Sequence, residues 1–259
     1  FIHGSFQSND AWPYDWSDLC ELAGYTYVPD DNFEQALVDL GYDDTLDNYV
    51  VTDSINSVTS LDVGEKEISD LTGIEDFTAL TILSCGQNQL TSLDVSSNTA
   101  LTILSCRNNQ LTSLDVSTNT SLTSLRCYDN QLTSLDVSAN TALTYLYCYT
   151  NQLAALDVSA NTALTLLTCS INELTALDVS NNTALTTLYC RSNQLTALDV
   201  SANTALTSLN CRINQLTYLN MKNGVTDALT TFNATNNLSL TCIETLNPDY
   251  ATANWTYAN

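Results

Sequence analysis

Basic side chains are scarce in this sequence of 259 residues, which holds six Lys plus Arg against 29 Asp plus Glu and carries a formal net charge of −23 at pH 7. A nucleic-acid-binding protein displaces the counterions of the phosphate backbone with its own cations, and anionic membranes attract the same cations. The charge balance therefore argues against both partners. Histidine is limited to His3, which excludes most catalysis that depends on an imidazole.

Long apolar runs and glycine-rich loops are missing as well. No run of 18 apolar residues occurs, so the sequence predicts no membrane-spanning helix. With seven glycines, the chain has no phosphate-binding glycine loop, and it has neither the G-x-S-x-G of hydrolases nor the H-E-x-x-H of zinc proteases. Its carboxylates recur in a regular series rather than as the special pair that hydrolyses glycosides. We therefore expect a protein that is not an enzyme.

The N-terminal sequence bears on location. It begins with Phe1 rather than Met and shows no basic segment followed by an apolar one, as in a chain whose signal peptide has been removed. Thr, Ser, Asn and Asp abound where Lys and Arg are rare. We expect an extracellular or cell-surface protein.

Cysteine marks an internal repeat. Seven of the nine cysteines recur every 21 residues, namely Cys85, Cys106, Cys127, Cys148, Cys169, Cys190 and Cys211. Around each lies the unit L-T-x-L-x-C-x-x-N-Q-L-T-x-L-D-V-S-x-N-T-A, first complete at 80–100 and continuing through 206–228. Such a period predicts a solenoid, because one unit cannot bury its apolar side alone.

Each unit divides into two similar halves, for example 101–109 and 111–119, which both read L-x-x-L-x-(C/V)-x-x-N. Side chains alternate along a strand, so the second Leu and the Cys or Val face the core. We expect a β-solenoid, a right-handed superhelix with two short parallel strands per 21-residue coil. The Asn that ends each half, such as Asn109 or Asn119, is expected to bond turn backbone and to stack into ladders.

The unit resembles the leucine-rich repeat, specifically the nested 21-residue bacterial type called IRREKO, over about residues 58–238. The stretch 60–79 resembles an internalin-type first repeat. Segments 27–37 and 240–255 are similar to secreted repeat proteins of Bacteroidetes-like bacteria. The resemblance implies a leucine-rich-repeat fold in which the first strand of each coil lines a concave binding face.

The chain is expected to divide into three regions: an N-terminal region with a helical cap at 1–57, the solenoid at 58–238 and a C-terminal cap at 239–259. Capping regions protect the terminal coils of a solenoid. At the C-terminal end, Phe232, Ile243 and Trp255 are expected to close the last coil.

A short helix is predicted within residues 30–41. Asp31 and Glu34 have the spacing of a capping box, and Gly41 is a stop signal. Its apolar face, formed by Phe33, Leu37 and Leu40, is expected to cover the first coil near Val51 and Ile55.

The regular cysteines are expected to be buried free thiols. A zinc site needs convergent ligands, which a linear column does not offer. Neighbouring Cβ atoms on parallel rungs would lie ~4.8 Å apart, beyond the ~3.8 Å usual in disulfides. The remaining two, Cys20 and Cys242, fall in opposite caps and should not pair with each other.

On the second half of the units the outward positions hardly vary, and they include a column of six aspartates, Asp94, Asp115, Asp136, Asp157, Asp178 and Asp199. Stacked carboxylates repel by ~0.9 kcal/mol per neighbouring pair in water. Hydroxyl donors with solvent would offset this, and so would Ca²⁺ held between rungs. We expect no cofactor, with Ca²⁺ as the open alternative.

On the first half the outward positions change from coil to coil. They hold every arginine of the chain and five of its 13 tyrosines, namely Arg107, Arg126, Arg191, Arg212, Tyr128, Tyr145, Tyr147, Tyr149 and Tyr189. Tyrosine offers amphipathic contact area, and arginine a planar fork for a carboxylate or sulfate. These nine residues are therefore our candidate ligand-binding site.

Two interpretations of this surface stay open. The tyrosines could simply stack, as Tyr128 and Tyr149 would on adjacent rungs, while the arginines relieve the negative charge. Alternatively the surface binds a ligand, with a protein partner favoured and an anionic polysaccharide as the alternative. A structural spacer within a larger adhesin is the third possibility.

Overall fold

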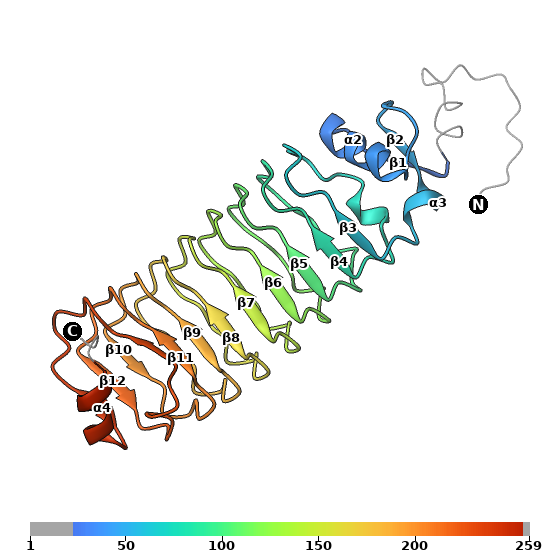
Figure 1. The fold of residues 1–259 in the computed structure, drawn as a ribbon. Coiled ribbons are helices and arrows are strands. Elements are labelled where there is room, and N and C mark those ends of the chain that lie inside the picture. The colour runs from blue at the N-terminus through green and yellow to red at the C-terminus, as the bar shows by residue number, and fades with distance from the viewer. Residues whose placement is uncertain (1–22, 256–259) are drawn as a thin grey trace, which may run out of the picture.

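The first half of each coil forms a short strand, and these strands stack into one parallel sheet. In the computed structural model, which describes residues 23–255, this sheet has nine strands in the order β13-β11-β9-β8-β7-β6-β5-β4-β3 (Figure 1). Its strands are β3 (Ser60–Asp62), β4 (Ile82–Ser84), β5 (Ile103–Ser105), β6 (Ser124–Arg126), β7 (Tyr145–Tyr147), β8 (Leu166–Thr168), β9 (Thr187–Tyr189), β11 (Ser208–Asn210) and β13 (Thr231–Asn233). Equivalent residues pair across coils, as Leu125 does with Leu146.

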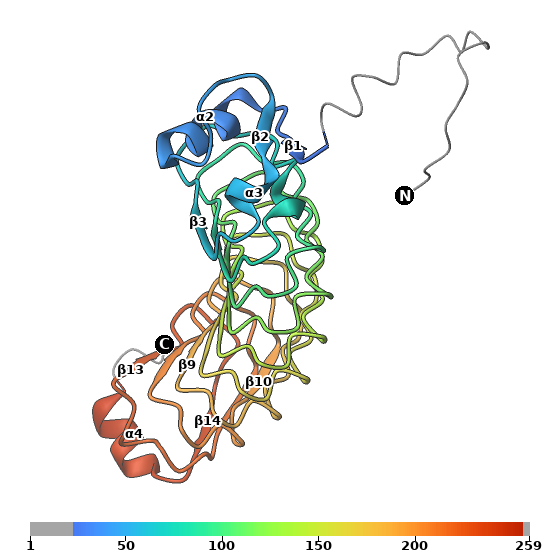
Figure 2. The same cartoon turned by 90° about the vertical axis from the view of Figure 1, so that its right-hand side faces the viewer.

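The second half of the coils pairs differently. Within residues 23–255 it forms strands only at the C-terminal end, where β10 (Ala197–Asp199), β12 (Tyr218–Met221) and β14 (Ile243–Thr245) make a three-stranded parallel sheet. In the preceding coils the predicted second strand is replaced by unpaired backbone. The solenoid curves with the nine-stranded sheet on its inner side (Figure 2). The rungs therefore lie closer together on the inner side, where the strands of all the coils pair, than on the outer side.

Side-chain burial follows the same difference between the two halves. Leu114, on an unpaired second half, keeps 7% of its surface exposed, whereas Leu198 within β10 keeps 1%. Leucines of the first half, such as Leu125, are fully buried. The core is thus tightest beneath the nine-stranded sheet.

The regular cysteines lie in this core as predicted. All seven are buried free thiols. Burial raises the pKa of these thiols, and it raises that of Cys106 to about 12. Cys242 is free and exposed, while the predicted position of Cys20 falls outside the described residues.

The asparagine that ends the first half of each coil bonds through both ends of its amide. Asn130 Nδ2 donates to the carbonyl oxygens of Cys106 at 3.0 Å and Cys127 at 3.2 Å, and its Oδ1 accepts from Leu111 N at 3.0 Å. Bonds of this kind repeat along the predicted first-half ladder, whose members are Asn88, Asn109, Asn130, Asn151, Asn172, Asn193 and Asn214.

The asparagine of the second half uses only its amide nitrogen. Asn140 Nδ2 donates to Val116 O and Asn119 O, both at 2.9 Å. Its Oδ1 is buried and has no hydrogen-bond partner among the described residues. The same holds for the whole second-half ladder, which consists of Asn98, Asn119, Asn140, Asn161, Asn182 and Asn203.

The N-terminal cap combines two strands and two helices. Strands β1 (Tyr25–Tyr27) and β2 (Tyr49–Val51) pair antiparallel, and helix α2 (Asp31–Leu40) lies between them in sequence. Helix α3 (Thr52–Ile55) follows, and a 3₁₀ helix η1 (Ile74–Asp76) lies in the first coil. The β1–β2 pair was not predicted, since strands of three residues give little periodicity.

The predicted capping box is wrong. Because α2 begins at Asp31, its N-cap is Asp30, whose Oδ1 accepts from the backbone N–H groups of Asn32 and Phe33, both at 3.0 Å. Glu34 is buried instead, and its Oε1 accepts from the backbone of the segment that enters β2. The spacing of the two acids fits a cap, but the chain enters the helix one residue earlier.

The apolar face of α2 is narrower than predicted. Phe33 and Leu37 are fully buried, as is Ile55. Leu40, however, is 48% exposed, and Val51 also faces outward. The helix ends at Leu40, so that residue lies at the fraying end rather than over the coil. Gly41 ends the helix as predicted, with a left-handed φ of 79°.

Asp30 also joins the cap to the first coil, which leads to a prediction. Its Oδ2 accepts from Ser69 N at 2.8 Å, Ser69 Oγ at 2.7 Å and Asp70 N at 3.0 Å. We expect Asp30→Ala to lower the free energy of unfolding by about 2–4 kcal/mol, because a helix cap and three further bonds are lost. Urea denaturation measures this loss. Asp31→Ala is the matched control, and an equal loss there would restore Asp31 as the cap.

The same residue sets a pH dependence. Partial burial raises the pKa of Asp30, but hydrogen bonds from Ser69, Phe33 and Asp70 outweigh it and hold the pKa below its usual value. A lowered pKa in the folded state stabilises the protein above the unfolded value of 3.8, and this stabilisation disappears as the pH falls through the folded value. Asp30→Ala should therefore unfold with less dependence on pH in this acid range.

The C-terminal end closes as predicted. Phe232, Ile243 and Trp255 pack against the core, and the rings of Phe232 and Trp255 lie 4.4 Å apart. Helix α4 (Pro248–Asn254), which precedes Trp255, was not predicted. Within the described part of the chain, no helix is long and apolar enough to span a membrane.

Candidate functional site

The candidate residues all lie along the inner sheet of the solenoid. The outward side chains of β4 to β9 and β11, together with the residue two positions after each strand, are called the variable face below. Four candidates lie within strands, namely Arg126 in β6, Tyr145 and Tyr147 in β7, and Tyr189 in β9. The other five follow strands by two residues and are Arg107, Tyr128, Tyr149, Arg191 and Arg212.

One column of the variable face is a continuous stack. The rings of Tyr128 and Tyr149 are 4.3 Å apart and inclined by 13°, as the sequence predicted for adjacent rungs. The Cζ of Arg107 lies 5.9 Å from the centre of the Tyr128 ring. Burial, with the neighbouring Tyr128 and Asp129, raises the pKa of Tyr149 to about 12, so its phenol stays neutral at physiological pH.

A second arginine repeats this arrangement in the adjacent column. The Cζ of Arg126 lies 5.6 Å from the centre of the Tyr147 ring. Tyr145 points outward from the same strand as Tyr147 and is 45% exposed. Tyr189 is half-buried and shares a 2.9 Å hydrogen bond with Ser208 Oγ, which gives it a packing role.

The structure brings only part of the predicted site together. Arg107, Arg126 and the four tyrosines of the β6 and β7 coils form one cluster, which we call the Arg–Tyr cluster. Arg191 and Arg212 lie in the coils of β9 and β11, beyond the coil of β8. The linear order of strands along a solenoid keeps these two arginines away from the cluster.

The arginines are not neutralised by neighbouring carboxylates. Among residues 23–255 the ion pairs are Lys66–Asp39 at 3.5 Å and Lys222–Glu244 at 2.7 Å, and both involve lysine. In a chain with 29 acidic residues, the four guanidinium groups thus have no ion-pair partner among the described residues.

A hollow of about 610 Å³ opens beside Arg107 and Arg126, at the N-terminal end of the variable face. It was not predicted. Its lining comes from four successive coils and includes Asp62, Glu65, Lys66, Ser84, Gly86, Gln87 and Ser105. The sequence did contain a sign of this hollow. Gly86 has no side chain, whereas the equivalent position in the next three coils holds Arg107, Tyr128 and Tyr149.

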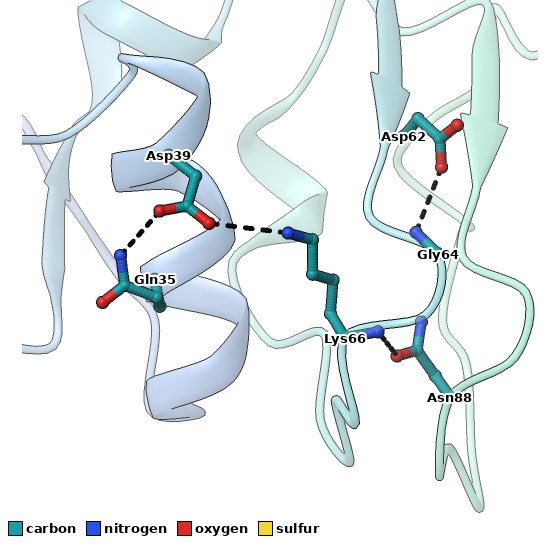
Figure 3. A network of polar contacts seen from close by, with 6 residues as sticks. All are labelled: Gln35, Asp39, Asp62, Gly64, Lys66 and Asn88. Carbon is teal, nitrogen blue, oxygen red and sulfur yellow. Dashed lines mark hydrogen bonds and ion pairs between the residues drawn. The ribbon is translucent and has the colours of Figure 1, made fainter.

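Figure 3 shows the polar contacts that join the first coil, which lines part of this hollow, to α2 and to the second coil. Lys66 Nζ reaches Asp39 of α2, whose other oxygen accepts from Gln35 at 2.9 Å. The backbone N–H of Lys66 donates to Asn88 Oδ1 at 3.1 Å, and Asp62 Oδ1 accepts from the backbone of the following turn at 3.1 Å. The charge of Lys66 is thus already paired with the cap.

The aspartate column on the outer side is engaged with its own turns. Asp136 Oδ1, for example, accepts from Ser138 N at 2.9 Å, and the same bond recurs in the other coils. Hydrogen bonds from the Ser138 hydroxyl and backbone lower the pKa of Asp136. Nowhere in the described residues do three His, Cys, Asp or Glu side chains come together as metal ligands would.

Sequence comparison gives one bacterial relative. No protein-family model matches the chain. Internalin J of Listeria monocytogenes serotype 4b (strain F2365) is 45% identical over 72 residues, which are 28% of this chain and 8% of Internalin J. The chain thus corresponds to a small part of that protein.

Structural comparison extends the likeness over most of the chain. The functional domain of Internalin J, described as including a cysteine ladder, matches with a TM-score of 0.63 and 36% identity, over 85% of this chain and 61% of that one. Internalin C2 of Listeria monocytogenes matches with a TM-score of 0.64 and 20% identity, over 85% and 94%. The second likeness shows the fold alone.

A plant protein shares the fold. The leucine-rich-repeat ectodomain of the membrane receptor kinase GASSHO1/SCHENGEN3 from Arabidopsis thaliana, solved in complex with Casparian strip integrity factor 2, matches with a TM-score of 0.64 and 20% identity. It covers 75% of this chain and 25% of that one. The predicted fold class is confirmed, while the IRREKO type and the Bacteroidetes-like origin stay predictions. The chain is a leucine-rich-repeat solenoid similar to the internalins of Listeria.

Proposed function

We propose that the chain is a secreted or cell-surface binding module that recognises a protein partner through its variable face. One observation carries this proposal: every arginine lies with tyrosine on the inner face, and none forms an ion pair with another residue of 23–255. Tyrosine and arginine are the residues that most often dominate binding energy at interfaces. The outer face repeats the same aspartate turn and carries little information.

The rigidity of the face supports recognition by a preformed surface. The Tyr128–Tyr149 stack and the two arginine–tyrosine contacts hold these side chains in place before any partner arrives. Little ordering entropy would then be lost on binding. The complex of the plant ectodomain shows that a solenoid of this fold can serve as a receptor.

An anionic polysaccharide is the alternative ligand, and a spacer without any ligand is the third possibility. The acidic side chains of Asp62 and Glu65 share the hollow with the arginines. They would repel a long polyanion lying along this end of the face. This observation favours a protein partner. The proposal assigns no catalytic role to any residue.

The test is a binding screen of the purified chain against bacterial and host surface proteins and a glycan array. We expect a protein ligand whose affinity falls at least tenfold in the Tyr145→Ala/Tyr147→Ala variant, since exposed aromatic side chains at an interface contribute about 2 kcal/mol or more. If the screen finds only a glycan, and the variant no longer binds it, the result would favour the polysaccharide. The affinity for that glycan should then fall steeply as the salt concentration rises.

A matched control lies on the outer face. Ser113→Ala/Ser134→Ala alters two exposed positions where later coils carry alanine, as at Ala155. This variant should bind like the wild type. A ligand that survives the tyrosine changes but is lost with the serine changes would move recognition to the outer face.

A further inference from the structure

Arg107 and Arg126 share one wall of the hollow at the N-terminal end of the variable face. Their Cζ atoms lie 5.9 Å and 5.6 Å from tyrosine rings of the following coils. A guanidinium group at this distance from a tyrosine ring is attracted to the ring and held near it. It carries five N–H donors, and those that remain unengaged can form a bidentate bond to a carboxylate.

Glycine at position 86 makes room for this arrangement. A Cβ there would lie 2.8 Å from Cγ of Arg107 and 3.1 Å from its carbonyl oxygen, so the arginine side chain would have to shift. The φ of Gly86 lies outside the left-handed region, so glycine is needed here for space rather than for backbone conformation. Gly86 therefore sets the position of Arg107.

The charged residues around the hollow come from different coils. Arg107 Nη1 donates to the neutral side chain of Asn108 at 3.3 Å, and neither arginine has an ion-pair partner among residues 23–255. On the first coil, which lines the same hollow, Lys66 is paired with Asp39, while Asp62 and Glu65 are exposed. The open site is thus cationic at the Arg–Tyr cluster and anionic on the first coil.

We propose that this hollow binds a single acidic side chain of a protein partner, with its carboxylate between Arg107 and Arg126. The proposal rests on the proposed function and names the chemical group that the variable face recognises. Asp62 and Glu65 restrict the site to one carboxylate, since a polyanion would place further negative charges against them. Apolar atoms next to the carboxylate would contact the tyrosine rings of the cluster.

The experiment selects peptides of random sequence on the intact chain and then titrates the best one into protein labelled with ¹⁵N at arginine. Because the chain has four arginines, their Nε–Hε groups give four separate signals. We expect the selected peptides to share an Asp or Glu, and the signals of Arg107 and Arg126 to shift more than those of Arg191 and Arg212. The counterpart peptide with Asn or Gln should bind about tenfold more weakly.

Variants separate charge from geometry. Arg126→Gln should lower the affinity for the acidic peptide about tenfold. Arg126→Lys should keep only part of the wild-type affinity, because an ammonium group cannot form the bidentate bonds of a planar guanidinium group. Gly86→Ala should weaken binding although no charge is removed. Lys222→Gln removes one charge at the far end of the solenoid and should change nothing. Each variant must keep the melting temperature of the wild type.

The outcomes distinguish this proposal from the proposed function. Peptides that need Tyr145 and Tyr147 but share no acidic residue would leave the proposed function standing and overturn the carboxylate site. A selection that yields no binder dependent on the variable face would overturn both. The proposal would also be overturned if heparin shifted the signals of Arg107 and Arg126 more than the acidic peptide does, since the site would then accept a polyanion.

Discussion

Raising the pH above 9 is expected to unfold the solenoid over a narrow interval. Burial raises the pKa of all seven core thiols above the ordinary value of 9.0, to about 12 for Cys106, Cys169 and Cys211. A thiol that is neutral in the core but ionised in the unfolded chain favours unfolding. The stabilisation is therefore fully present below pH 9 and is lost as the pH rises towards the folded value.

The size of this effect comes from repetition. Each buried thiol contributes about 1.4 kcal/mol per pH unit between its unfolded and folded pKa. Seven thiols in one column act together, so the loss approaches roughly 10 kcal/mol per pH unit. Typical domains are stable by only about 5–15 kcal/mol, which places the midpoint near pH 10. Tyr149, whose pKa is raised to about 12, adds to the loss.

Circular dichroism against pH, combined with urea denaturation, measures this dependence. The slope of the unfolding free energy with pH gives the number of protons released. Replacing Cys127, Cys148 and Cys169 by alanine should remove three of the seven titrating groups and reduce the slope in proportion. Cys242→Ala, at an exposed position, should leave it unchanged. An unaltered slope in the triple variant would show that the thiols do not control alkaline unfolding.

The second large effect is expected from the first-half asparagine ladder. Asn130→Ala would leave the buried Leu111 N–H without its partner, and it would remove one of two asparagine donors from each of the carbonyl oxygens of Cys106 and Cys127. We expect the free energy of unfolding to fall by about 3–5 kcal/mol, since the orphaned N–H costs about 1–3 kcal/mol and each of the two lost hydrogen bonds about 0.5–1.5 kcal/mol. Urea denaturation and hydrogen exchange at Leu111 measure the loss.

The second-half ladder supplies a matched comparison. Asn140→Ala orphans neither the Val116 nor the Asn119 carbonyl oxygen, because each keeps a backbone donor, and it removes a buried side-chain oxygen that has no donor among the described residues. The expected loss is smaller, about 1–3 kcal/mol. Asn181→Ala, on the exposed surface, should stay within about 0.5 kcal/mol of the wild type. Equal losses at Asn130 and Asn140 would contradict the difference between the two ladders.

Much of the fold could be predicted because the solenoid repeats local relations. A contact between Leu125 and Leu146 spans one period, and the same period appears along the sequence as a regular spacing of identical residues. The buried cysteines, both asparagine ladders and the surface that gathers the arginines all follow from position within the unit. Each prediction rests on the alternation of side chains along a strand.

Relations that do not repeat were harder to predict. Asp30 bonds to Ser69, 39 residues away, and no period connects a cap to its coil. The choice between Asp30 and Asp31 as helix cap depends on where the chain enters α2, which this tertiary bond helps to fix. The hollow beside Arg107 likewise depends on Gly86 and on a first coil whose Lys66 is held by α2.

The sequence by itself determined the coil length, the buried columns and the surface that carries the Arg–Tyr cluster, because these depend on neighbours one period apart. Only the tertiary structure decided which strands pair and where the hollow opens. Curvature brings the rungs closest together on the inner side, where nine strands pair, and among residues 23–255 a second strand forms only in the coils of β10, β12 and β14. Curvature arises from the packing of all coils together, and no single repeat specifies it.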